Sequence, residues 1–406
     1  MVSPQAQPQA QPQTRRLGVL VLNAISASGL SRLPAERYRV GKDVADPAAI
    51  LVRSADLHGM NIPASVRAIG RAGAGTNNIP VLAMSARGVP VFNAPGANAN
   101  AVKELVLAGM FMAARQIAPA LRFAAALDVQ AEDLDKVVED GKKAFAGYEL
   151  QGQTLGIVGL GKIGCLVADA AIKLGMNVLG YDPEITVDAA WSLPSQVKRA
   201  ASVNEVLRSA QFVSLHVPLV EATRGIVNDA NIGLMRAGAV LLNFSREGVA
   251  SNSAIVDALN SERLAAYVCD FPSPELHAHP RVVALPHLGA STREAEENCA
   301  VMVVDQLRDY LEHGQIANAV NFPQVQMARE SAFRVAIANS NVPNMLGQIS
   351  TTMANAGLNI HNMVNKSRGD MAYTLVDVES AVAGPELQAL AAIHGVLAVR
   401  YLPDVK

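Results

Sequence analysis

A glycine-rich turn is the most specific chemical signal in this sequence. The apolar segment TLGIVG at 154–159 runs into three glycines spaced G-x-G-x-x-G and then into a helical pattern. In such a turn the first glycine permits a tight bend, the second lets backbone N–H groups approach a pyrophosphate, and the third packs a helix against a strand. The helix N-terminus adds positive potential. We therefore expect a dinucleotide to bind at Gly159, Gly161, Lys162, Ile163 and Gly164.

The kind of dinucleotide is indicated by Asp182. This residue ends the next apolar segment, NVLGYD, about 20 residues beyond the turn. A carboxylate at that distance accepts a hydrogen bond from a ribose 2′-OH and would repel a 2′-phosphate. NAD is therefore favoured over NADP. A purely structural glycine turn is the alternative, and the acid at Asp182 argues against it.

The elements that must position these residues follow an α/β order. Apolar segments at 17–22, 49–52 and 66–69 predict buried strands, 101–116 predicts a buried helix, and 120–148 predicts a polar connector. Strands and helices then alternate, which predicts a parallel sheet covered on both faces. The later strands are expected at 154–159, 177–181, 212–216, 240–244, 266–270 and 282–285, and helices at 163–174, 203–210, 228–235, 253–259 and 290–313.

Composition excludes several classes of function. Half of the 406 residues are apolar and 17% are charged, which excludes a mainly disordered chain. A net charge of −2 and an aromatic content of 4% argue against nucleic-acid partners. The longest apolar run, 105–114, is too short to span a membrane, so we expect no membrane partner. Three scattered cysteines fit neither disulfides nor a metal site, which favours the cytoplasm. Residues 1–14 are expected to be a disordered tail without a targeting signal.

Eight motifs resemble the D-isomer-specific 2-hydroxyacid dehydrogenases over about residues 15–406. They are VRS at 52–54, RAGAGTNNI at 71–79, NAPGANANAVKEL at 93–105, GLGKIG at 159–164, HVPL at 216–219, NFSRE at 243–247, CDFPSPE at 269–275 and PHLGAST at 286–292. The family pattern implies a catalytic Arg, Glu and His, which match Arg246, Glu275 and His287. Glu275 lies in a segment that departs from the family's D-V-F-x-x-E-P, but it is the only carboxylate between Phe271 and His287.

These three residue types suit oxidation of an alcohol. A histidine can take the hydroxyl proton as a hydride leaves for the nicotinamide. A carboxylate beside the histidine favours its protonated form, and a guanidinium can hold a substrate carboxylate and polarise the new carbonyl. Glu247 stands where the family usually has glycine, next to Arg246. The resemblance assigns further cofactor contacts to His216, Val217, Pro218, Thr223, Phe244, Ser245, Asp270 and Gly289; for Pro218 the alternative is a strand terminator.

Substrate residues also follow from the resemblance. Arg53 and Arg71 match positions at which the 3-phosphoglycerate-oxidising members contact substrate, and two extra cations favour a phosphorylated 2-hydroxy acid. Backbone N–H groups at Ala74 and Gly75 are expected to take the substrate carboxylate, as in other backbone nests. Ser54 and Asn98 complete the expected set. The alternative for the arginines is an ordinary surface charge.

Residues 331–406 predict a βαββαβ order, which is that of a ferredoxin-like sandwich. This module resembles an ACT domain, a unit that senses amino acids. The resemblance implies effector contacts at Asn339, Asn341 and Asn359, with L-serine as the first candidate. Asn339 stands where the family has His, and Asn344 where it has Gly. A purely structural, dimer-forming module is the alternative.

The predicted fold class is α/β, with two Rossmann-like doubly wound domains flanking a cleft and a C-terminal ferredoxin-like module. We expect a substrate-binding domain at 15–97 and 291–325, an NAD-binding domain at 98–290 and an ACT domain at 331–406. The expected activity is NAD-dependent oxidation of 3-phospho-D-glycerate to 3-phosphohydroxypyruvate, the first step of L-serine synthesis, in a homo-oligomer. The alternatives are a dehydrogenase for another D-2-hydroxy acid, including 2-oxoglutarate reduction, and a non-catalytic NAD-sensing corepressor.

Overall fold

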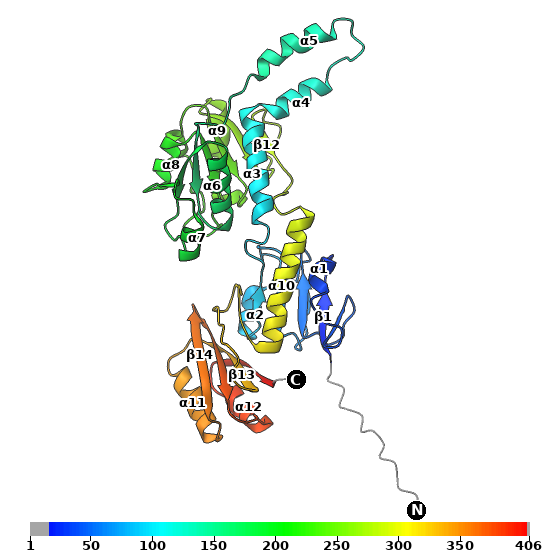
Figure 1. The fold of residues 1–406 in the computed structure, drawn as a ribbon, viewed down its shortest axis with the longest axis vertical. Coiled ribbons are helices and arrows are strands. Elements are labelled where there is room, and N and C mark those ends of the chain that lie inside the picture. The colour runs from blue at the N-terminus through cyan, green and yellow to red at the C-terminus, as the bar shows by residue number, and fades with distance from the viewer. Residues whose placement is uncertain (1–15, 404–406) are drawn as a thin grey trace, which may run out of the picture. The chain divides into compact units, whose positions relative to one another are not determined.

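The computed structural model describes residues 16–403. Contacts divide them into two compact units, one of residues 16–97 with 296–403 and one of residues 98–295 (Figure 1). The tail expected at 1–14 lies outside the described residues. The three domains expected from the sequence remain a proposal, in which the first unit contains both the substrate-binding domain and the C-terminal module.

Within residues 98–295, seven strands form one parallel sheet in the order β12-β11-β10-β9-β6-β7-β8. The strand order reverses beside β6, and ligands of such sheets lie at the carboxyl ends of the strands at that reversal. The strands are β6 (Thr154–Val158), β7 (Asn177–Tyr181), β8 (Lys198–Arg199), β9 (Phe212–Leu215), β10 (Ala239–Asn243), β11 (Leu264–Cys269) and β12 (Val282–Ala284).

Helices cover this sheet because their apolar stripes are buried against it. In α3, Val106 and Met110 are buried, and a side chain at Gly109 would meet Val268 of β11 at 3.0 Å. Ser202 and Ser251 accept hydrogen bonds from the first turns of α8 and α9, as N-cap residues do. The helices are α3 (Ala99–Ala114), α6 (Lys162–Lys173), α7 (Val187–Ser192), α8 (Val203–Ser209) and α9 (Asn252–Asn260).

Two sequence expectations for this unit were wrong. The helix expected at 228–235 is only a short 3-10 turn, Ile232–Leu234. The Asn231 side chain accepts from the backbone N–H of Asn228 and donates to Ile226, so local side-chain bonds replace the helical ladder. The connector expected at 120–148 contains α4 (Ile117–Ala125), α5 (Leu134–Gly141) and a 3-10 turn, Lys142–Phe145.

Within residues 16–97, five parallel strands form a second sheet in the order β2-β1-β3-β4-β5. The strand expected at 66–69 is found two residues later. Helix α10 (Arg293–His313) lies close against β4, because a side chain at Gly70 would meet Leu307 of α10 at 2.7 Å. The other elements are β1 (Leu17–Val21), α1 (Ala27–Leu30), β2 (Tyr38–Gly41), β3 (Ala49–Val52), β4 (Ala68–Arg71), α2 (Val81–Ala86) and β5 (Val91–Phe92).

Residues 333–403 form a βαββαβ module with an antiparallel sheet in the order β14-β15-β13-β16, as the sequence predicted. One face of the sheet packs on the module's two helices through residues such as Ile337 and Val376. The elements are β13 (Phe333–Ser340), α11 (Met345–Asn355), β14 (Ile360–Arg368), β15 (Met371–Val378), α12 (Gly384–Ala391) and β16 (Val396–Pro403).

The other face of this sheet packs on the C-terminal end of α10. The Tyr373 hydroxyl donates to the carbonyl of Gly314 at 2.7 Å, and Arg400 donates to the carbonyls of Tyr310 and Leu311. Arg334, fully buried, pairs with Asp377 at 2.6 Å and also donates to the carbonyl of His313. These bonds satisfy helix-terminal carbonyls that would otherwise lack partners. The module is therefore joined to the domain that contains α10.

Among the described residues, no single helix is long and apolar enough to cross a membrane. Helices α3 and α4 meet the criterion only when taken together, and a bend of 68° separates them. The side chains of α3 that face the sheet are buried inside the domain.

Candidate active site

The glycine turn has the geometry that a pyrophosphate requires. Gly159 has a φ of +96°, and a side chain there would meet the carbonyl of His216 at 2.7 Å. A side chain at Gly164 would overlap the carbonyl of Gly159, so this glycine lets α6 approach the turn. Gly161 instead faces open space, with nothing within 4 Å of the position of a β-carbon. Backbone at Gly161 can therefore be approached closely by a ligand, next to Lys162 and Ile163 at the start of α6.

Asp182 lies beside this turn at the carboxyl end of β7. Its Oδ2 accepts from the backbone N–H of Leu160 at 2.8 Å, and its Oδ1 accepts from Glu184 at 2.9 Å. The two bonds fix the carboxylate against the glycine turn, while each oxygen retains a lone pair for a further donor. The residues of this edge therefore fit a dinucleotide with a free ribose 2′-OH.

His287 lies in a loop between β12 and α10 with a left-handed backbone, φ +57°. Such a conformation is uncommon for a residue with a side chain and costs roughly 1–3 kcal/mol. Asp270, buried after β11, accepts hydrogen bonds from the backbone N–H groups of Leu288 and Gly289, each at 2.7 Å. The imidazole is exposed and meets the ring of Phe271 edge-on, with centroids 5.3 Å apart. Asp270 thus fixes the backbone that follows His287, and Phe271 packs against the imidazole ring.

Glu275 and Arg246 are also exposed at this edge of the sheet. Hydrogen bonds with its own backbone N–H, and then with the side chains of Ser273 and Asn252, lower the pKa of Glu275. In residues 16–403 no hydrogen bond or ion pair joins Glu275 to His287. Arg246 follows β10, and its Nη1 donates to the carbonyl of Ser245 at 2.6 Å.

The loop that carries Arg246 is shaped by Asn243. This fully buried side chain donates to the carbonyl of Arg246 at 2.9 Å and accepts from the N–H and hydroxyl of Ser245. Phe244 points the other way, into the core, and is 5% exposed. A ligand at this loop would therefore meet Ser245 and Arg246, whereas only the backbone of Phe244 remains for it.

The expected adenosine-side residues lie after β9. His216 shares a hydrogen bond of 2.9 Å with the hydroxyl of Ser214, and its shielded Nδ1 has no partner among the described residues. Burial lowers the pKa of His216 to about 4, so the imidazole is neutral. The Thr223 hydroxyl donates to the carbonyl of Pro218 and accepts from the N–H of Val220, which closes the turn that follows Val217.

The expected substrate residues of the first unit lie together at the carboxyl edge of the second sheet. Val52 of β3 pairs with Arg71 of β4, so Arg71 ends one strand and Arg53 follows the end of the adjacent strand; the charges of both arginines act on the buried Cys299. The guanidinium of Arg71 lies over Gly73, where a side chain would overlap its Nη1. Arg53 donates to Glu296 of α10 at 2.7 Å.

The neighbouring loops at this edge are held by asparagines. Asn23 accepts from the backbone N–H groups of Ser54 and Ala55, and Asn93 donates to the carbonyl of Ala74 at 2.6 Å. No acceptor among the described residues pairs with the N–H groups of Ala74 and Gly75, which leaves both for a carboxylate. Asn98 belongs to the other unit, where it precedes α3 without a capping side-chain bond.

Comparison with known proteins identifies the family that shares these arrangements. Residues 107–289 match the model of the D-isomer specific 2-hydroxyacid dehydrogenase NAD binding domain. The D-3-phosphoglycerate dehydrogenase of Haemophilus influenzae is 33% identical over 344 residues, which cover 81% of this chain and 79% of that protein. The chain belongs to the D-isomer-specific 2-hydroxyacid dehydrogenases. The D-3-phosphoglycerate dehydrogenase of Escherichia coli K12 is likewise 33% identical over 84% of this chain and 83% of its own.

Solved structures agree on the fold of this dehydrogenase. The TT0316 protein of Thermus thermophilus matches with a TM-score of 0.61 at 27% identity, covering 75% of this chain and 100% of that one. An NAD+-bound 3-phosphoglycerate dehydrogenase of Entamoeba histolytica matches with a TM-score of 0.58 at 24% identity, over 75% and 98% of the two chains. The predicted fold class and family are confirmed.

The expected effector residues of the dehydrogenase are spread over the C-terminal module. Asn339 is fully buried, donates to the carbonyl of Ser340 and has no partner for its Oδ1 in the described chain. Asn341 is exposed and donates to the carbonyl of Gly369 at 3.0 Å. Asn359 is exposed at the other end of α11, a helix of 11 residues that spans roughly 16 Å. One copy of the module therefore does not bring Asn341 and Asn359 together on one amino acid.

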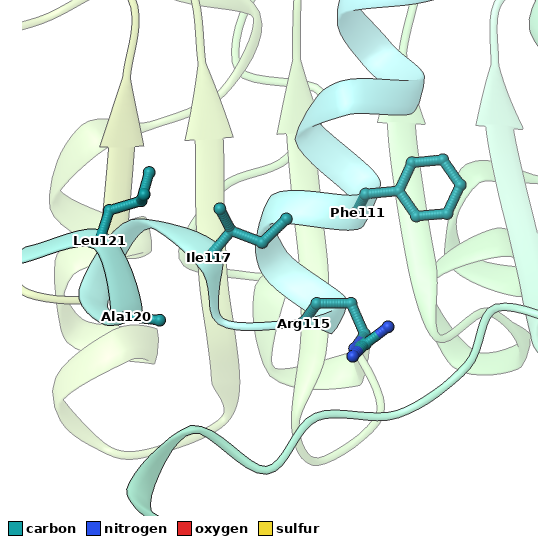
Figure 2. A pocket seen from close by; sticks show the side chains of 5 residues that line it. All are labelled: Phe111, Arg115, Ile117, Ala120 and Leu121. Atoms are coloured by element: carbon teal, nitrogen blue, oxygen red, sulfur yellow. The ribbon is translucent and has the colours of Figure 1, made fainter. Parts of the chain in front are cut away.

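Sequence reasoning missed Asn23, Asn93, Asn243, Phe271 and Glu296 as parts of the site. Asn93, Asn243 and Phe271 stand inside the motifs that carry the family resemblance, so the motifs offered a signal for them. Glu296 and Asn23 had none, because their partners lie 243 and about 30 residues away in the chain. A surface pocket of about 470 Å³ is lined by Phe111, Arg115, Ile117, Ala120 and Leu121 and contains none of the expected site residues (Figure 2).

Proposed function

We propose that the chain oxidises 3-phospho-D-glycerate to 3-phosphohydroxypyruvate with NAD, as the first step of L-serine synthesis. The observation that carries this proposal is the pair of arginines, Arg53 and Arg71, at the carboxyl ends of adjacent strands. Two guanidinium groups suit a phosphate dianion, and the unpaired N–H groups of Ala74 and Gly75 beside them suit the carboxylate. A 2-hydroxy acid without a phosphate would need only the N–H groups that bind its carboxylate.

The residues of the other unit supply the chemistry. The glycine turn and Asp182 would hold NAD, whose nicotinamide would supply an acceptor for the hydride of substrate C2. His287 takes the hydroxyl proton, and its strained loop is fixed by Asp270 so that the imidazole is presented to the substrate. Arg246 stabilises the negative charge that develops on the substrate oxygen. Glu275, exposed at the same edge of the sheet, supplies the carboxylate that supports the protonated imidazole.

A panel of substrates tests the proposal. We expect NADH formation with 3-phospho-D-glycerate to have a higher kcat/KM than with D-glycerate, D-lactate or D-2-hydroxyglutarate. His287→Ala should lower kcat by about 10²–10⁴-fold while NADH still binds. Equal kcat/KM values across the panel would instead assign the enzyme to unphosphorylated acids. Complete lack of turnover with intact NAD binding would favour the corepressor.

We also propose that the arm of α4 and α5 joins two copies of the chain. Neither helix buries any side chain in its own chain, and two apolar residues of the arm are exposed: Leu121 of α4 at 62% and Val129, between the helices, at 68%. Acidic residues are frequent in the arm near α5, and Arg115 at the pocket of Figure 2 is a basic residue that can pair with one of them from a second copy. The acidic residues of this segment are Asp128, Glu132, Asp133, Asp135, Glu139 and Asp140, of which the last two form ion pairs with Lys142 and Lys143. Leu121→Glu should convert a dimer to monomers in sedimentation equilibrium, and an unchanged mass would refute the arm's role.

The C-terminal module is proposed to be an ACT domain that binds a small amino acid, with L-serine as first candidate. Asn341 and Asn359 can hydrogen-bond an α-amino and α-carboxylate pair, and they meet only if two modules associate. Calorimetry with L-serine and glycine on the whole enzyme tests this, with Asn341→Ala as the matched variant. No binding at millimolar concentration would leave the module a structural role.

We place the enzyme in the cytoplasm, where its three free, buried cysteines stay reduced.

A further inference from the structure

The substrate-facing arginine Arg53 has an acidic partner that no motif indicates. Its Nη2 donates to Oε1 of Glu296 at 2.7 Å, and the two side chains are 34% and 42% exposed. Arg53 follows β3, whereas Glu296 lies near the N-terminal end of α10, the helix that packs on β4 of the same sheet. The pair therefore stands at the carboxyl edge where the phosphate is proposed to bind.

Arg71 belongs to the same group of charges. Cys299, one turn along α10 from Glu296, is buried, which raises the pKa of its thiol; the charges of Arg71 and Arg53 oppose that shift and the charge of Glu296 adds to it. The edge thus combines two cations with one anion. Because Glu296 contacts only one terminal nitrogen of Arg53, the remaining guanidinium N–H groups stay available to an oxyanion.

We propose that Glu296 is a specificity-determining residue that weakens the affinity of this edge for phosphate dianions. The inference rests on the proposed function, since it assumes that the substrate phosphate binds Arg53. A phosphate on the remaining donors of Arg53 lies within one guanidinium width of the Glu296 carboxylate. The two negative charges of the phosphate are then repelled by the negative charge of Glu296.

The alternative is a positioning role, in which Glu296 holds the Arg53 side chain in place and strengthens phosphate binding. The magnitudes decide between the two. A solvent-exposed ion pair contributes at most about fivefold to any equilibrium. A unit charge a few ångströms from a dianion changes its affinity by on the order of tenfold or more, even with strong solvent screening. Repulsion therefore exceeds positioning, and Glu296 raises the KM for the phosphorylated substrate and speeds release of the phosphorylated product.

Glu296→Gln tests the proposal because it keeps the shape and the hydrogen-bond acceptor but removes the charge. We expect the KM for 3-phospho-D-glycerate to fall on the order of tenfold, with a smaller change for D-glycerate. Inorganic sulfate should inhibit the variant at correspondingly lower concentration. Glu297→Gln is the matched control, because Glu297 is the next residue of α10 and forms no ion pair among the described residues.

Three results would overturn the inference. A higher KM in Glu296→Gln would show that the residue positions Arg53, and an equal decrease in Glu297→Gln would show only a general field effect. The sulfate measurement separates this failure from failure of the proposed function. If neither enzyme oxidises 3-phospho-D-glycerate, calorimetric sulfate binding still compares wild type, Glu296→Gln and Arg53→Ala. Unchanged sulfate affinity in Glu296→Gln would then refute the role of Glu296 by itself.

Discussion

Asp270 binds the backbone of Gly289 through its Oδ2 at 2.7 Å, and its Oδ1 binds the N–H of Leu288 at the same distance. Both oxygens of a buried carboxylate thus serve the loop that holds His287 in a left-handed conformation. From the sequence, Asp270 was expected to contact the nicotinamide carboxamide. In the structure both of its oxygens accept from the backbone that follows His287, and a carboxamide contact would use the lone pairs that remain.

Asp270→Asn should therefore lower kcat more than it weakens NADH binding. The amide offers one acceptor where the loop needs two, and its NH2 faces a backbone N–H. Loss of a hydrogen bond to a charged group amounts to about 1.5–3 kcal/mol, so kcat should fall on the order of tenfold to a hundredfold. Stopped-flow NADH binding and steady-state kinetics measure the two effects. Exposed Asp257→Asn is the control, and a variant with normal kcat would exclude the positioning role.

Asp182 should determine the choice of cofactor. Asp182→Ala removes the acceptor for a ribose 2′-OH and is expected to raise the KM for NAD on the order of tenfold or more. Asp182→Asn keeps an acceptor but removes the charge that repels a 2′-phosphate, so it should gain NADP activity with a smaller loss of NAD activity. Comparing kcat/KM for the two cofactors in both variants checks this. Wild-type enzyme that used NADP as efficiently as NAD would contradict the assignment.

His216 predicts a pH dependence of stability. Its pKa is lowered by burial to about 4, whereas an unfolded chain has a histidine pKa near 6.5. Between these values the unfolded state binds more protons than the folded state, so stability falls as pH decreases from about 6.5 to 4. The full effect is about 3 kcal/mol. Urea denaturation at pH 7 and pH 5 should show a loss of about 2 kcal/mol in wild type and a smaller one in His216→Gln; equal losses would contradict it.

Much of the fold could be predicted from the sequence because buried parallel strands are continuous apolar runs. The strands 49–52 and 177–181 were predicted with the bounds that the structure shows. The helix expected at 228–235 failed because Asn228 and Asn231 bond the local backbone. Helices α4 and α5 were missed because they bury no side chains, and an apolar period was the signal used.

The candidate site, too, was predicted in part: roles that depend on nearby residues were predicted, and contacts between distant residues were not. The glycine turn and Asp182 were predicted because their roles depend on residues close in sequence. The ion pair of Arg53 with Glu296 joins residues 243 positions apart, and only the packing of α10 on β4 brings them together. The same holds for Asp270 and the loop of His287, where each residue was singled out but their connection was not.

The buried pair of Arg334 and Asp377 provides the last prediction. Both side chains are fully buried, two nitrogens of Arg334 bond the two oxygens of Asp377, and Arg334 also binds the carbonyls of His313 and Ala328. Asp377→Asn leaves the guanidinium buried without a counter-charge and should destabilise the enzyme by about 3–5 kcal/mol. The double variant Arg334→Met/Asp377→Leu removes both charges and should recover most of that stability. Thermal and urea unfolding of the three proteins measure these changes. A double variant no more stable than Asp377→Asn would show that the hydrogen bonds of Arg334 to the carbonyls of His313 and Ala328 stabilise the module more than the ion pair does.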